Sequence, residues 1–281
     1  MSELKTTRPR IAIPVPHSGD REYAERALPQ YEEAVRGAGG EPVRIELDQT
    51  PVQVMKQIER CDAVLLPGSR ADVDPKKYSA DRHEKTASAD AQRELMDDLL
   101  LQDAYNLHKP VLGICYGLQS LNVYRAGSLV QHIESPVNHE AGRKVPVAHE
   151  VEIDRGSRLA EVLEFREGTA SSRAAGDPKT SNGTTRSRAL PGLIIPANSS
   201  HHQSADVIGD GLKIVARCPK DGIIEAVEGT SPDHFVLAVQ WHPERSFEDD
   251  ERSRAIFRAL VEAARQKHLE LVGEFEGRQE S

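Results

Sequence analysis

Short apolar segments alternate with helical segments through the N-terminal half, and this alternation constrains the fold most strongly. The segment between Asp62 and Pro67, AVLL, is continuously apolar. A parallel strand that is covered by helices on both faces has this character. Four strands alternating with helices predict a doubly wound α/β fold, in which a mostly parallel sheet has helices on both faces. The predicted strands are RIAIPV (10–15), EPVRIEL (41–47), DAVLLP (62–67) and PVLGI (110–114).

Three helical segments are predicted between these strands. The segment PQYEEAVRGAGG (29–40) has apolar residues at helical spacing and ends at two glycines. Thr50-Pro51-Val52-Gln53 has the form of a capping box with proline at the first helical position. A third helix is expected from about Ser88 to His108.

The C-terminal half is richer in strands and has few helices between them. We therefore expect antiparallel additions to the sheet, followed by a last helical segment at about 250–270. The predicted strands are VPVAHEVEID (145–154), GLIIPA (192–197), LKIVARC (212–218), GIIEAVEG (222–229) and HFVLAVQ (234–240).

The domain organisation is predicted to be simple, with a single domain over 9–270 and tails at 1–8 and 271–281. A segment at about 166–192 is rich in Ser, Thr, Gly, Arg and Ala and has almost no residues to bury. Such a composition is typical of a flexible surface insertion.

Composition and charge exclude several classes of function. The net charge of −9 disfavours binding to nucleic acids or anionic membranes. No apolar segment approaches the ~20 residues of a membrane span, and the N-terminus lacks a secretory signal. The three cysteines include no C-x-x-C pair, so we expect a cytoplasmic protein without disulfides.

Cys115 lies between two glycines, Gly113 and Gly117, directly after a predicted strand and before a predicted helix. This G-x-C-x-G pattern is typical of a sharp turn that presents a nucleophile at the carboxyl end of a strand. The N-terminus of the helix would also favour the thiolate form. A buried structural cysteine is the alternative interpretation of this pattern.

Two other strand ends could complete an active site around this thiol. The strand at 236–240 leads to His242 and Glu244, whose side chains would face the same side of an extended segment. They could serve as the base and its orienting group. The turn at Gly68 and Ser69 could supply one backbone amide to an oxyanion hole, and Tyr116 another.

Several segments in this order resemble the class I glutamine amidotransferase-like superfamily, with its flavodoxin-like sheet. Within it, the chain is most similar to the γ-glutamyl-γ-aminobutyrate hydrolases, the peptidase C26 family, from about residue 10 to 265. The resemblance is carried by LLPGSRADVDPKKY, PVLGICYGLQSLNV, GSLVQHI, HEVEI, ANSSHHQ, DGIIEAVE and AVQWHPE.

The resemblance implies a catalytic triad of Cys115, His242 and Glu244. It also implies oxyanion donors at the 68–69 turn and at position 116, where these hydrolases commonly have arginine and this chain has tyrosine. Gln119, His201 and His202 match substrate-side positions of the family. A homodimer is a further expectation from the family.

The implied reaction is hydrolysis of a small γ-glutamyl-amine through a thioester, which requires no metal or organic cofactor. Adjacent His201 and His202 would point to opposite sides of an extended segment, and His242-Pro243-Glu244 lacks the P-C-x-x-C partner of zinc deaminases. We therefore expect no metal. A glutaminase subunit that supplies ammonia to a synthetase, or a non-catalytic binding protein on the same fold, are the alternatives.

Overall fold

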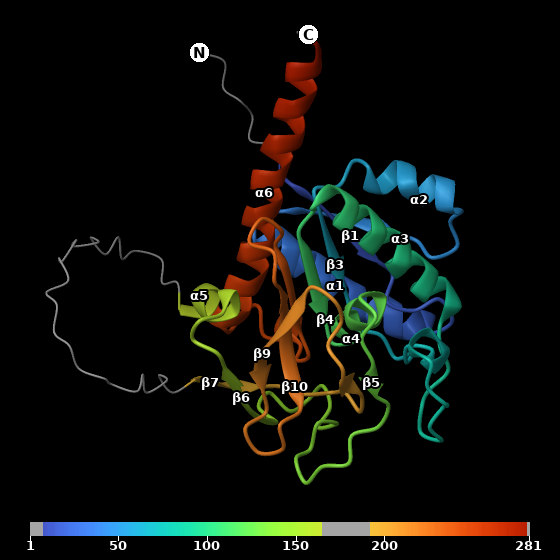
Figure 1. Ribbon diagram of the computed structural model, residues 1–281, viewed down its shortest axis with the longest axis vertical. Helices are drawn as coiled ribbons and strands as arrows, with labels where there is room; N and C mark the ends of the chain where they lie inside the picture. Colours follow the sequence, from blue (N-terminus) through green and yellow to red (C-terminus); the bar gives the residue numbers. More distant parts are fainter. Residues whose placement is uncertain (1–7, 165–191, 280–281) are drawn as a thin grey trace, which may run out of the picture.

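The computed structural model describes residues 8–164 and 192–279. Its main feature is a large sheet with helices around it (Figure 1). The sheet has nine strands in the order β2-β1-β3-β4-β11-β10-β9-β6-β7. The first five of these strands are paired in parallel, and the other four are added antiparallel. The predicted α/β fold with antiparallel additions is therefore confirmed. The strands are β1 (Arg10–Pro14), β2 (Glu41–Ile45), β3 (Ala63–Leu66), β4 (Val111–Ile114), β6 (His149–Ile153), β7 (Leu193–Ala197), β9 (Leu212–Arg217), β10 (Ile224–Gly229) and β11 (Val236–Val239).

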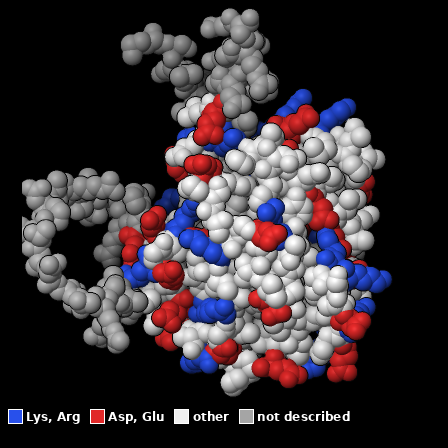
Figure 2. Space-filling model, viewed as in Figure 1, with Lys and Arg blue, Asp and Glu red and all other residues white. Residues whose placement is uncertain are grey.

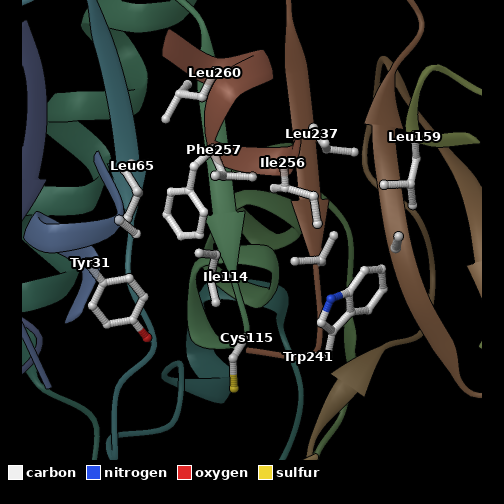
Figure 3. Close-up of a cluster of buried hydrophobic side chains, with 14 of the residues drawn as sticks. Tyr31, Leu65, Ile114, Cys115, Leu159, Leu237, Trp241, Ile256, Phe257 and Leu260 are labelled. Atoms are coloured by element: carbon white, nitrogen blue, oxygen red, sulfur yellow. The ribbon is translucent and has the colours of Figure 1, made fainter. Parts of the chain in front are cut away.

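Helices cover both faces of the sheet, and each face has its own apolar core. Side chains of α1, α5 and α6 pack with Leu65 and Ile114 on one face (Figure 3). Side chains of α2, α3 and α4 pack with Val64 and Leu66 on the other. Successive residues of a strand point to opposite faces of the sheet. The central strands β3, β4 and β11 are apolar along their length, so they contribute to both cores. The helices are α1 (Arg21–Gly37), α2 (Pro51–Ile58), α3 (Ala91–Leu107), α4 (Tyr116–Tyr124), α5 (Arg158–Glu164) and α6 (Glu251–Gln279).

Two helices differ in extent from the sequence prediction. Helix α1 begins at Arg21, two turns before the predicted segment, because Asp20 caps it by accepting a hydrogen bond from the Tyr23 amide. Pro29 therefore lies inside the helix. Helix α6 continues to Gln279, into the segment expected to be a C-terminal tail. The capping box at Thr50 and Gln53 is present as predicted.

Strand β11 determines where the C-terminal half meets the N-terminal half. It pairs in parallel with β4, so the ends of both strands lie at the same edge of the sheet. The backbone amide of Cys115 continues this pairing by donating a hydrogen bond of 2.8 Å to the Val239 carbonyl. The residues that follow β4 and β11 are thereby brought together.

The outer surface is mixed in charge. Lysine and arginine side chains are interspersed with aspartate and glutamate over the face shown in Figure 2. Among the described helices, none is both long enough and apolar enough to cross a membrane. The predicted insertion at 166–192 lies almost wholly outside the described residues, and the single-domain organisation remains a prediction.

Candidate active site

Cys115 occupies a sharp turn between β4 and α4. Its φ of 54° and ψ of −105° lie in a region that residues other than glycine rarely adopt. A conformation of this kind costs about 1–3 kcal/mol and persists only where the surrounding structure enforces it. The sulfur points beyond the carboxyl end of β4, away from the apolar core (Figure 3). The geometry is that of a strained turn that presents the side chain of Cys115 at the end of the strand.

The two flanking glycines are required by the close approach of neighbouring backbone. A Cβ atom at Gly117 would lie 2.1 Å from the carbonyl oxygen of Leu66. A Cβ atom at Gly113 would lie 2.8 Å from the backbone of Gly117. Real Cβ atoms do not approach backbone atoms this closely, so the spacing of the G-x-C-x-G pattern is a steric requirement of the turn.

His242 and Glu244 form a buried pair next to this turn. The two atoms His242 Nδ1 and Glu244 Oε1 are 2.8 Å apart. The local backbone differs from the extended segment that the sequence predicts, because Pro243–Arg245 forms a turn of 3-10 helix. Proline suits the first position of a helical turn, where its missing N–H has no partner to lose. The two side chains meet across this turn.

The His242 imidazole lies beside Cys115. A Cβ atom at Gly68 would be 3.1 Å from His242 Cε1 and 3.7 Å from Cys115 Cβ, so both residues pack against the same point. Both line one pocket of about 250 Å³, together with Glu244 and Ser69. The buried Nε2 atom of His242 has no hydrogen-bond partner within the described part of the chain. The Nδ1 atom is thus committed to Glu244, and Nε2 is free to exchange a proton.

Electrostatics favour the charged forms of the pair. Burial lowers the pKa of His242 more than any other single effect, but the Glu244 carboxylate and the Cys115 sulfur together outweigh it and raise that pKa to about 9. Burial raises the pKa of Glu244, but His242 and Arg245 together hold it below its ordinary value. An imidazolium between a carboxylate and a sulfur is the arrangement that stabilises a thiolate.

The structure distinguishes between the two oxyanion donors predicted at the 68–69 turn. The Gly68 amide donates a hydrogen bond of 3.1 Å to the hydroxyl of Tyr31. The amides of Ser69 and Tyr116 donate no hydrogen bond to any described residue. Ser69 also lines the pocket. The geometry therefore favours Ser69 and Tyr116 as the pair of donors, with Gly68 held by Tyr31.

The three predicted substrate-side residues lie outside this pocket. Gln119 is buried, and its Nε2 donates to the Gln203 carbonyl at 3.1 Å. His201 is also buried, with Nδ1 2.9 Å from the same carbonyl. His202 Nε2 lies 3.1 Å from a carboxylate oxygen of Asp72. Both histidines line a neighbouring pocket, and the structure does not bring them to Cys115.

The pocket contains residues that sequence reasoning did not identify. Tyr23 and Tyr31 come from α1, which no motif connects with Cys115. Arginines on helices and loops look like ordinary surface residues in a sequence, so the sequence does not indicate which of them line a pocket. Four of them line the pocket, namely Arg26, Arg70, Arg143 and Arg245.

The chain is similar in sequence to several known proteins. A Mycobacterium tuberculosis relative with a glutamine amidotransferase name is 34% identical over 240 residues, covering 83% of this chain and 66% of its own. The γ-glutamyl-γ-aminobutyrate hydrolase of Escherichia coli O157:H7 is 30% identical over 250 residues, covering 85% of this chain and 86% of its own.

The fold also matches that of solved structures. The structure of PurLQS from Thermotoga maritima has a TM-score of 0.53 and 18% identity, covering 91% of this chain and 99% of that one.

The sequence profile of the peptidase C26 family matches residues 15–244. The chain therefore belongs to the peptidase C26 family, and it is a hydrolase.

Proposed function

We propose that this protein hydrolyses the γ-glutamyl amide bond of small γ-glutamyl-amines and releases glutamate. The observation that carries the proposal is the position of His242. One nitrogen of its ring is held by Glu244, the other is buried without a hydrogen-bond partner among the described residues, and the ring lies beside the strained Cys115 turn. A thiol, a base and an orienting carboxylate in this order are the parts of a cysteine hydrolase.

The reaction would proceed in two halves. The Cys115 thiolate attacks the γ-carbonyl carbon, and the amides of Ser69 and Tyr116 stabilise the resulting oxyanion, by about 3 kcal/mol per donor in comparable sites. Protonated His242 gives its proton to the departing amine as the C–N bond breaks, which leaves a γ-glutamyl thioester. Water then attacks the thioester with His242 as base, and glutamate and the free thiol are released.

The charge around the pocket supports a substrate whose leaving amine carries a negatively charged group. Four arginines line it, and Glu244, already paired with His242, is the one acidic residue among the described residues that do so. Three of the arginines are paired with carboxylates, namely Arg26 with Glu22, Arg70 with Asp20 and Arg245 with Glu244. Arg143 forms no ion pair with any described residue and is exposed. We therefore favour a substrate whose leaving amine carries a carboxylate, such as γ-glutamyl-γ-aminobutyrate.

A matched pair of substrates tests this proposal. Glutamate release should be at least about tenfold faster, in kcat/KM, from γ-glutamyl-γ-aminobutyrate than from γ-glutamyl-butylamine, which lacks the carboxylate. Arg143→Gln should reduce this preference, whereas Lys144→Gln, at the neighbouring exposed position outside the pocket, should not.

The same assay separates the alternatives. Free glutamine as the preferred substrate would indicate an ammonia-supplying glutaminase, and no turnover of any γ-glutamyl amide would indicate a binding protein. Undiminished glutamate release by Cys115→Ala would overturn the proposed mechanism. The cytoplasmic location and the homodimer remain predictions from the sequence.

A further inference from the structure

Three histidines and one glutamate converge in the interior, at a place that the proposed reaction does not use. His139 precedes β6, His149 begins it, His201 follows β7, and Glu225 lies in β10. Their exposed fractions are 3%, 5%, 4% and 0%. The four ligand atoms, one from each residue, all lie within 4.8 Å of one another.

The inward-facing atoms of this cluster lack hydrogen bonds. Glu225 Oε1 is 3.4 Å from His139 Nδ1, 3.4 Å from His149 Nε2 and 3.8 Å from His201 Nε2. None of these four atoms has a hydrogen-bond partner among the described residues, and neither does Glu225 Oε2. Buried polar atoms are normally satisfied, and leaving several unsatisfied in one place is unfavourable. The three distances from Glu225 Oε1 are close to the ~3.3–3.4 Å between ligands that a tetrahedral ion holds at bond lengths of about 2.0–2.1 Å.

The outward-facing nitrogens of the three histidines are each held by an acceptor. His139 Nε2 lies 2.8 Å from Asp221 Oδ2. His201 Nδ1 lies 2.9 Å from the Gln203 carbonyl, and His149 Nδ1 lies 3.2 Å from the carbonyl of Glu150. An acceptor at the outer nitrogen fixes the proton there and turns the lone pair of the other nitrogen inward. Metal-binding histidines are oriented in this way.

We propose that His139, His149, His201 and Glu225 bind one divalent transition-metal ion, with Zn²⁺ as the best fit. Imidazole nitrogens with one carboxylate suit this ion, and four protein ligands leave no open position, as in structural sites. The two negative charges of Glu225 and Asp221 balance the dication. This proposal departs from the expectation of no metal. The four ligands are spread from residue 139 to 225, so no short spacing reveals them.

The ion would connect β6 and β10 with the loop after β7, which lies next to His242. His201 belongs to the loop after β7, and Asn198 in the same loop bonds to the backbone of His242. His202 points elsewhere, to Asp72, as expected for adjacent residues of an extended segment. Binding of the ion therefore fixes the loop that supports the general base, and it should stabilise the folded state.

Metal binding to the full-length chain tests the proposal. The protein is treated with a chelator, then dialysed against Zn²⁺ or Co²⁺, and bound metal is measured by elemental analysis. The Cys115→Ala chain is used throughout, so that the reactive thiol does not contribute. We expect one ion per chain with a dissociation constant at or below about 1 μM, a higher unfolding temperature with Zn²⁺, and the visible absorption of tetrahedral Co²⁺.

Variants locate the ion. Glu225→Gln, which preserves shape, and His149→Gln should each weaken binding at least about 100-fold. His202→Gln is the matched control, because it removes a neighbouring histidine that is not one of the proposed ligands. His202 and His132 form a less buried histidine pair, with 3.3 Å between their Nδ1 atoms. The His202→Gln substitution should leave binding unchanged, as should Cys218→Ser, which removes the thiol from the alternative ligand group of His139, Cys218 and Asp221. Absence of stoichiometric binding by the folded parent chain would overturn the proposal. So would binding that survives Glu225→Gln and His149→Gln, or that is lost in either control.

Discussion

Asn198 holds the backbone of His242 at both of its polar groups. Its Nδ2 donates to the His242 carbonyl, its Oδ1 accepts from the His242 amide, and both distances are 2.9 Å. The two residues are 44 positions apart, and both are buried. This pair of bonds fixes the point at which the chain leaves β11, and so it sets the position of the imidazole.

Removing this support should slow catalysis without weakening substrate binding. Asn198→Ala should lower kcat by about 10- to 100-fold with little change in KM, because the base is displaced from the thiol. It should also cost about 1–3 kcal/mol of stability, since the buried partner groups lose their hydrogen bonds. Steady-state kinetics and urea unfolding measure the two effects.

Asn122 provides the control for this substitution. It is a buried asparagine that bridges backbone groups of Ser128, Val207 and Gly209. Asn122→Ala should lose similar stability but retain kcat. A comparable fall in kcat for both variants would show that Asn198 acts only through stability.

A buried arginine anchors the turn that carries the proposed oxyanion donor Ser69. Arg93 is ion-paired to Asp97 at 2.7 Å, and its Nη2 donates to the Pro67 carbonyl at 2.7 Å, directly before Gly68 and Ser69. Arg93→Met should destabilise the fold by about 3–5 kcal/mol, because it leaves Asp97 buried and unpaired. It should also reduce kcat, because the turn that carries the Ser69 amide loses its anchor.

Lys109 allows the two effects to be separated. It forms a buried ion pair with Asp103 at 2.7 Å, but it precedes β4, at the opposite end of the strand from Cys115. Lys109→Met should therefore cost similar stability in urea unfolding while the remaining folded enzyme keeps its kcat. Equal kcat values for the two variants would contradict the role given to Arg93.

The pH dependence of the reaction should depend on His242. Its pKa is raised to about 9, so the imidazolium, which we propose protonates the leaving amine, persists at neutral pH and is lost as the pH rises through that value. The kcat/KM profile should therefore fall on the alkaline side near pH 9. Because the Glu244 carboxylate raises this pKa, Glu244→Gln should shift the alkaline fall to lower pH. An unshifted profile in that variant would contradict the assigned coupling.

The raised pKa of His242 also makes the stability of the folded state depend on pH. The protonated form of His242 is favoured in the folded state, so its stabilising contribution is complete below the ordinary histidine pKa of ~6.5 and is lost as the pH rises through about 9. Urea unfolding at pH 7 and at about pH 10 should show this loss in the parent chain and a smaller one in Glu244→Gln.

Local patterns predict the parts of the molecule that depend on local sterics. The glycines at 113 and 117 indicate the nucleophile turn, and the apolar segment after Phe235 indicates a strand that ends near His242. The 3-10 turn at Pro243 was not predicted, because the residues that follow a strand were expected to continue as an extended segment. The first position of a helical turn is where proline is tolerated best.

Features made by distant segments could not be predicted in this way. The contacts of Asn198 with His242 and the cluster around Glu225 depend on how β6, β7, β10 and β11 are placed in the sheet. Gln119 and His201 share the Gln203 carbonyl instead of reaching the pocket, which also depends on the tertiary arrangement. Sequence spacing contains no direct information on these contacts.

Detection of the acyl-enzyme tests the central claim most directly. The enzyme is mixed with γ-glutamyl-γ-aminobutyrate, quenched with acid during turnover, digested and examined by mass spectrometry. A γ-glutamyl group should be found on the peptide that contains Cys115 and not on those with Cys61 or Cys218, which are buried elsewhere. An unmodified Cys115 during turnover, together with continued glutamate release by Cys115→Ala, would contradict the account.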